Sequence, residues 1–154
     1  MTSDERRPDI FSDLSPDERA TLERFARRRE FDKDEIVLRE GQHNASLFVV
    51  NSGLLHARMK VDQQGDTMLG RLEPRSFFGE VSVFDPGETS ATVVAVTKVE
   101  VLEIERDQLL LFVQENPVAG SKLLLRFIQV IAGRVRMADD RLGDALLLNR
   151  LIAE

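Results

Sequence analysis

The chain has 154 residues and a mass of 17.4 kDa, a length typical of one domain that buries its core without disulfides. It contains no cysteine, no membrane-spanning run and no visible secretory signal, which excludes thiol chemistry and predicts a cytoplasmic location without membrane contact. Its 27 acidic and 21 basic residues give a net charge of −6, which disfavours non-specific binding to nucleic acid, because such binding neutralises phosphates.

The first predicted element is a short helix that begins after Ser15. The stretch Ser15–Glu18 combines a capping residue, a proline in the first turn and a glutamate three residues after the cap. Leu22 and Phe25 follow at helical spacing, which predicts that the helix ends near residues 28–30. The run Arg27–Arg29 is flanked by acidic residues, and we interpret it as the solvated end of this helix rather than a phosphate-binding patch.

Residues 31–105 predict antiparallel β structure. Apolar or alternating runs rich in β-branched residues are separated by turn signals. The predicted strands lie within residues 36–38, 47–50, 55–61, 68–72 and 91–104. Short strands at such intervals predict an antiparallel β-roll, a jelly-roll-like barrel. The expected fold class is therefore mainly β with flanking helices, and we assign residues 1–116 to the β-roll with its N-terminal helix.

The C-terminal part of the chain predicts two helices. The first covers residues 107–114, and Asn116-Pro117 interrupts it. The second is long, begins at Val118 and runs at least to Leu142. Gly143 either lies within this long helix or ends it, because glycine weakens a helix.

The long helix carries a heptad pattern typical of a two-stranded parallel coiled coil. Every a and d position from Leu124 to Ile152 is apolar except Asn149. We therefore assign residues 117–154 to a region that forms a homodimer. The alternative is that this apolar face packs on the β-roll of the same chain. The candidate interface residues are Leu124, Ile128, Ile131, Val135, Ala138 and Leu142, with Arg134 expected to pair with Asp139 of the second chain.

The segment of residues 77–93 lies between two β stretches and carries the most information about function. Gly79 permits backbone angles that other residues avoid, and Glu80–Phe84 predicts one helical turn. The N–H groups that begin such a turn point outward and suit an anion. This pattern is unspecific on its own, because many loops contain glycine and glutamate.

With its surroundings, this segment resembles the phosphate-binding cassette of the cyclic-nucleotide-binding domain family, of the catabolite activator protein and protein kinase A regulatory subunit type. The similarity covers about residues 9–140, and the order and spacing of five fragments carry it. Ile10–Leu14 resembles the opening helix, Val37–Gly41 and Leu47–Gly53 resemble strands with their turns, Phe78–Glu80 begins the cassette, and Val99–Ile104 resembles the last strand.

The resemblance implies a β-roll in which cassette amides and one arginine bind a cyclic phosphate, while Glu80 binds the ribose 2′-hydroxyl. Thr89 stands where the family has that arginine, Glu88 precedes it, and no lysine or arginine occurs between Arg75 and Lys98. We therefore expect no cation opposite Glu80. Phosphate binding should be about ten- to hundredfold weaker, since a hydrogen bond to a charged group contributes roughly 1.5–3 kcal/mol. The candidate ligand-binding residues are Phe78, Gly79, Glu80, Val81, Ser82, Thr89, Ser90 and Ala91.

These observations leave three functions open. The first is a stand-alone homodimeric regulatory or sensor module with a cyclic nucleotide as candidate effector. The second is a protein-interaction scaffold with a non-functional pocket, which Thr89 and Glu88 favour and which implies a partner protein. The third is the sensor half of a truncated transcriptional regulator. Because the chain stops at Glu154 without room for the helix-turn-helix domain of such regulators, no direct DNA binding is expected.

No catalytic or metal site is expected. The sequence contains no nucleophile elbow, P-loop or dinucleotide fingerprint, so we predict that the chain is not an enzyme. His43 and His56 have neither metal-ligand spacing nor an acidic cluster beside them. The cyclic nucleotide implied by the resemblance is the one small molecule that the sequence suggests.

Overall fold

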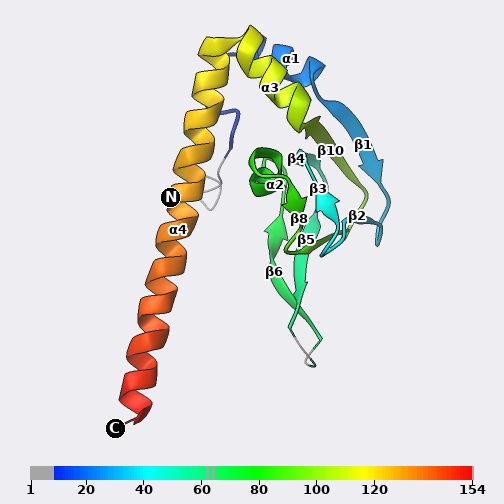
Figure 1. The fold of residues 1–154 in the computed structure, drawn as a ribbon. Coiled ribbons are helices and arrows are strands. Elements are labelled where there is room, and N and C mark those ends of the chain that lie inside the picture. Colours follow the sequence, from blue (N-terminus) through cyan, green and yellow to red (C-terminus); the bar gives the residue numbers. More distant parts are fainter. Residues whose placement is uncertain (1–8, 62, 64, 154) are drawn as a thin grey trace.

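The computed structural model describes residues 9–61, 63 and 65–153. Figure 1 shows a β-roll beside one long helix that continues well beyond it. The helices are α1 (Pro16–Arg24), α2 (Glu80–Phe84), α3 (Arg106–Glu115) and α4 (Pro117–Ala153). The strands are β1 (Arg27–Phe31), β2 (Ile36–Leu38), β3 (His43–Asn44), β4 (Ser46–Ser52), β5 (Leu55–Lys60), β6 (Asp66–Leu72), β7 (Phe77–Phe78), β8 (Gly87–Glu88), β9 (Thr92–Ala95) and β10 (Val99–Glu105).

Within the described residues the strands form three antiparallel sheets. The order is β1-β10-β4-β7 in the first sheet and β2-β9-β5-β6 in the second, and β3 pairs with β8 in a two-stranded ladder. Helix α2 interrupts the strands between β7 and β8, where the sequence predicted one helical turn. The predicted fold class, mainly β with an N-terminal helix and a long C-terminal helix, is confirmed.

The two phenylalanines of β7 show how the first sheet divides the core. Successive residues of a strand face opposite sides of the sheet. Phe77 packs edge to face on Phe127 of α4, with ring centroids 5.5 Å apart, whereas Phe78 stacks on Phe48 at 4.9 Å. One buried cluster therefore joins this sheet to the helices, and a second fills the inside of the roll. Phe78 belongs to the inner cluster.

The prediction for the run Arg27–Arg29 is wrong. Helix α1 ends at Arg24, and the three arginines lie on β1, opposite β10. Their guanidinium groups pair with glutamates across the strands, at 2.9 Å to Glu105, 3.1 Å to Glu100 and 3.0 Å to Glu103. Opposite charges on diagonal neighbours across the two strands stabilise the pairing, and the contact with a distant strand overrides the local helical spacing.

The N-terminus of α1 has the capping box that the sequence predicted, and it also contacts α4. The Ser15 hydroxyl accepts from the Glu18 backbone N–H at 3.1 Å, and the Glu18 carboxylate accepts from the Ser15 N–H at 3.0 Å. The Lys122 ammonium donates to the same carboxylate at 2.8 Å. The hydrogen bonds from Lys122 and from the Ser15 backbone hold the pKa of Glu18 below its usual value of 4.5.

We expect Glu18→Gln to lower the melting temperature at pH 7. A carboxyl whose pKa is depressed in the folded state stabilises the fold above its unfolded pKa and loses this contribution as the pH falls through the folded pKa. The difference between wild type and Glu18→Gln should therefore shrink as the pH falls below 4.5. Thermal unfolding over this pH range measures it, with Glu30→Gln on exposed β1 as the control. A difference that does not change with pH would contradict the assignment.

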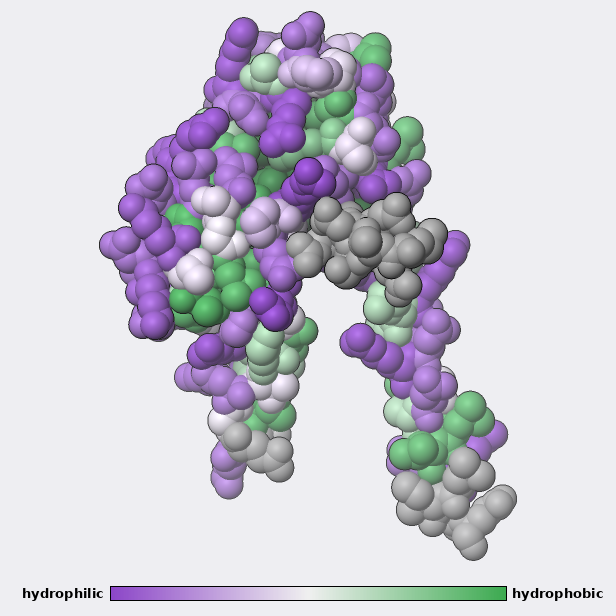
Figure 2. Space-filling view, turned by 180° about the vertical axis from the view of Figure 1, so that it is seen from behind, coloured by the Kyte–Doolittle hydropathy of each residue, from purple (hydrophilic) through white to green (hydrophobic). Residues whose placement is uncertain are grey.

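Helix α4 has two unlike halves. Ala119, Leu123 and Phe127 are buried against the core, whereas every side chain from residue 132 to residue 150 is exposed. Figure 2 shows apolar side chains on this outer part of the helix. The helix continues through Gly143, so the alternative that it ends there is wrong. In the part of the chain that the structure describes, no helix is both long and apolar enough to cross a membrane.

Candidate functional site

The turn from β7 into α2 depends on Gly79. Its φ of +80° lies in the left-handed region, which side chains with a Cβ rarely adopt. A Cβ at this position would also collide with the carbonyl oxygen of Ser46 and approach Asn44 Nδ2 to 3.1 Å. Both neighbours are fixed, because the buried Asn44 side chain bonds the backbone of Ser46. The glycine therefore lets the chain turn tightly enough to bring Glu80 into the roll.

Gly79→Ala is expected to cost about 2 kcal/mol or more of folding free energy, because strain and collision add. Gly41 is the matched control, since it has the same φ of +80° but no neighbouring atom within 4 Å of the position that a Cβ would take. Gly41→Ala should cost only about 1 kcal/mol, the penalty of the backbone angle alone. Urea unfolding of both variants measures the difference, and equal losses would contradict the close approach at Gly79.

A cavity of about 480 Å³ opens beside this turn, which is within the usual range for small-molecule sites. The predicted ligand-binding residues, Phe78 to Ser82 and Thr89 to Ala91, all line it. The structure thus brings together the two ends of the cassette. Ligand binding by these residues stays a prediction.

The strands supply a second set of lining residues that the sequence analysis missed. Leu38, Ala57, Leu72 and Val93 line the cavity from β2, β5, β6 and β9, and Leu69 covers one side of it from β6. These residues carry no motif, because any apolar residue that faces inward meets the requirement. The alternation of apolar and polar residues in β5 is the signal that could have identified Ala57, whereas β9 has no such alternation in its sequence.

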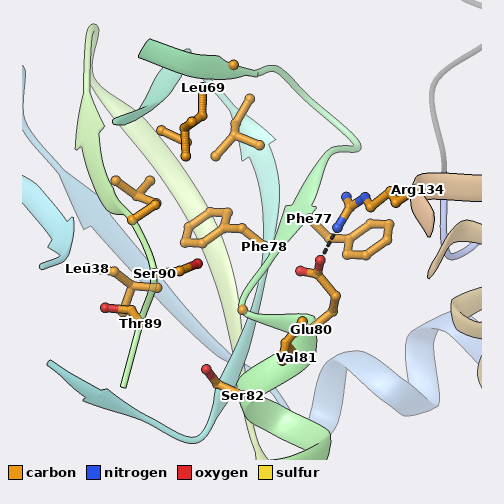
Figure 3. Close-up of a pocket in the computed structure, with 16 residues that line it drawn as sticks. Leu38, Leu69, Phe77, Phe78, Glu80, Val81, Ser82, Thr89, Ser90 and Arg134 are labelled. Carbon is orange, nitrogen blue, oxygen red and sulfur yellow. Dashed lines mark hydrogen bonds and ion pairs between the residues drawn. The ribbon is translucent and has the colours of Figure 1, made fainter. Parts of the chain in front are cut away.

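The expectation that no cation stands opposite Glu80 is wrong. Arg134 of α4 reaches across to the cassette, and its Nη1 donates to Glu80 Oε1 (Figure 3). The guanidinium also lies over the Phe77 ring, 5.2 Å from its centroid. The Glu80 residue is only 8% exposed, so this pairing offsets the cost of burying its carboxylate. The partial burial of the Arg134 guanidinium against the cassette lowers its pKa, although a guanidinium stays protonated in proteins.

At the end of the cassette near Thr89, the hydrogen-bonding groups of Thr89 are used within the protein. The Thr89 hydroxyl donates to the Arg39 carbonyl at 2.6 Å, so its proton is directed at the backbone. Two further backbone bonds join Thr89 to Gly41 and Gln42, at 2.8 Å and 2.9 Å. In Figure 3 Thr89 and Arg134 are drawn on different sides of Phe78. Among the described residues that line the cavity, Arg134 is the one cation.

The described residues contain no group of three or more His, Asp, Glu or Cys side chains placed to hold a metal ion. The described residues that line the cavity offer hydrogen bonds, one ion pair and apolar contacts.

The β-roll, the turn at Gly79 and the cavity together define a cyclic-nucleotide-binding fold. The comparison with known proteins agrees. Residues 28–116 match the family described as "Cyclic nucleotide-binding domain". This match covers more than half of the chain, and the chain belongs to that family.

Similar proteins include regulators that respond to cyclic AMP. The "CRP-like cAMP-activated global transcriptional regulator" of Mycobacterium tuberculosis is 26% identical over 140 residues, covering 91% of this chain and 61% of that protein. The "Cyclic AMP receptor protein" of Thermus thermophilus is 30% identical over 131 residues, covering 84% and 58%. The crystal structure of the Thermus thermophilus catabolite activator protein superposes with a TM-score of 0.81 at 27% identity, covering 88% and 62%. The chain thus spans about three fifths of the length of these relatives.

Proposed function

We propose that this chain is a regulatory sensor module in which a small molecule binds in the cassette cavity and α4 transmits its presence. The observation that carries the proposal is the contact of Arg134 with Glu80 and Phe77. All three residues line the cavity, so a bound molecule meets the cassette and the long helix together. The names of the relatives, which describe cyclic AMP-activated regulators, support a regulatory role.

The position of Arg134 on α4 supports a role in transmission. Every side chain from residue 132 to residue 150 is exposed, and Arg134 makes the ion pair and the ring contact that join this stretch to the cassette. A molecule that changes this contact changes how the outer part of α4 is held. We propose a division at residues 116 and 117, with the β-roll as sensor and residues 117–154 as the dimerisation region.

We also propose that α4 forms a homodimer. The apolar stripe that packs on the roll contains Leu123 and Phe127, whereas Ile128, Val135 and Leu142 of the heptad pattern are exposed. Leu124 and Ile131 of the same pattern are half-buried, so the alternative that the heptad face packs on its own β-roll applies at most to these two positions. Exposed apolar residues in a continuous heptad pattern are typical of a coiled-coil seam.

Calorimetric titration of the full chain with cyclic AMP, cyclic GMP and adenosine tests the sensor proposal. Heat with at least one of these probes is expected, and it should be lost in Ala57→Phe and in Ser90→Trp, which place large side chains at two positions of the cavity lining. Hydrogen exchange of residues 132–150 should change when the binding probe is present. Absence of heat with all three at millimolar concentration, together with no cavity-dependent binding of an uncharged dye, would overturn the proposal.

A protein-interaction scaffold is the second candidate, and the direction of the Thr89 hydroxyl favours it. That hydroxyl bonds the Arg39 carbonyl, and no cation among the described residues that line the cavity lies beside it to hold a phosphate. A scaffold would retain binding to its partner protein when Glu80→Ala alters the cavity. It would lose partner binding when a charge replaces Ile131 or Val135 on α4.

A further inference from the structure

The charged groups that line the cavity cancel one another. Of the described lining residues, Glu80 and Arg134 are the ionised ones, and they form an ion pair. The lining therefore carries no net charge. An anion that enters it gives up water without meeting an unpaired cation, which costs free energy.

At the Thr89 end of the cassette, the described residues that line the cavity offer an anion no charged donor. Thr89 directs its hydroxyl proton to the Arg39 carbonyl, and Glu88 next to it is exposed and negative. Ser90 has a hydroxyl on the cavity wall, which supplies one neutral hydrogen bond. A hydroxyl group contributes roughly half of what a charged donor does. The place where the family has an arginine is therefore neutral or slightly negative.

The remaining wall favours a flat apolar body. Phe78 presents a ring held in place by its stack on Phe48 (Figure 3), and Leu38, Leu69 and Val93 also line the cavity. Aromatic and aliphatic walls of this kind contact a ring system closely. The cavity of about 480 Å³ has room for a molecule of two or three fused or linked rings.

The polar groups select for hydrogen-bond donors on that molecule. Glu80 uses one carboxylate oxygen for Arg134, and its other oxygen has no partner among the described residues. A carboxylate only accepts hydrogen bonds, so this oxygen suits a hydroxyl or an N–H of the ligand. An anionic oxygen at the same place would be repelled.

From the neutral lining, the apolar wall and the acceptor at Glu80, we propose that the cavity selects an uncharged, ring-containing molecule with hydroxyl groups, and discriminates against a cyclic phosphate. This inference rests on the proposed sensor function, because it names the class of effector that the same cavity takes. The ion pair of Glu80 and Arg134 serves to keep the buried end of the cavity neutral rather than to bind a phosphate.

Adenosine and cyclic AMP are matched probes, because they share base and ribose and differ by the charged cyclic phosphate. Calorimetry with the full chain should give adenosine an affinity at least equal to that of cyclic AMP, with about a tenfold advantage expected. The adenosine affinity should not change between low and high salt, since screening acts on charges. Cyclic AMP bound tenfold more tightly than adenosine, with an affinity that falls at high salt, would overturn the inference and leave the sensor function standing.

The uncharged dye Nile red covers the case in which neither nucleoside-based probe binds. Its emission should rise with wild type and remain low with Ala57→Phe and Ser90→Trp, which supports an uncharged ligand class. Circular dichroism verifies that both variants fold. If Nile red also fails to distinguish wild type from the filled cavities, both this inference and the sensor function are overturned.

Discussion

Thr89→Arg is expected to raise the affinity for cyclic AMP about ten- to hundredfold and to leave the affinity for adenosine unchanged. The backbone of residue 89 is held by Gly41 and Gln42 at the cavity rim, so a longer side chain starts from a fixed position. A guanidinium there gives a phosphate one charge-assisted hydrogen bond, which contributes roughly 1.5–3 kcal/mol. The bond from the Thr89 hydroxyl to Arg39 is lost, which lowers stability by about 1 kcal/mol.

Calorimetry with both ligands at low and high salt measures this effect. Thr89→Gln is the control, because it adds length and hydrogen-bonding groups without a charge. It should change neither affinity more than about twofold, whereas the gain of Thr89→Arg should diminish at high salt. An equal gain with Thr89→Gln, or an equal gain for adenosine, would show that charge at this position does not limit phosphate binding.

Features that depend on a few neighbouring residues could be predicted from the sequence. The capping box of Ser15 and Glu18, the interruption at Pro117 and the turn at Gly79 are of this kind. Each follows from local backbone chemistry, which is the same in any fold. The resemblance added the order of these features, and it placed the two ends of the cassette at one cavity.

Features that depend on distant contacts could not be predicted in the same way. β1 has helical spacing of apolar residues just before it, and only its pairing with the glutamates of β10 makes it a strand. Arg134 is 54 residues away from Glu80. The heptad position of Arg134 predicted an ion pair with a second helix. The sequence does not show the angle at which α4 leaves the β-roll, so the contact with Glu80 could not be predicted.

The geometry of α4 explains why the heptad pattern predicted an exposed apolar stripe but did not predict the contact of Arg134 with the β-roll. Phe127 and Arg134 are both g positions of the pattern, one helical heptad apart, and both face the roll. The a positions Ile128 and Val135 lie next to them on the helix and remain exposed. One helix therefore presents neighbouring stripes to two different surfaces, and periodicity alone cannot say which stripe meets which surface.

Val135→Asp is expected to dissociate the proposed homodimer. Val135 is 54% exposed in the single chain and occupies an a position at the centre of the seam, so its change leaves the β-roll intact. In a parallel dimer the two substituted residues face each other. Their two carboxylates would then give up their bound water while lying side by side. This costs several kcal/mol, so the dissociation constant should rise about a hundredfold or more.

Met137→Asp is the matched control for this prediction. Met137 is 57% exposed on the same helix and also apolar, but it lies at a c position away from the seam. Met137→Asp loses more helix propensity than Val135→Asp, so a greater dissociation of Val135→Asp can come only from contact across the seam. Sedimentation equilibrium over a range of concentrations should give a dimer for wild type and Met137→Asp and a monomer for Val135→Asp. A monomeric wild type, or equal dissociation of the two variants, would contradict the seam, because the heptad positions would then have no bearing on assembly.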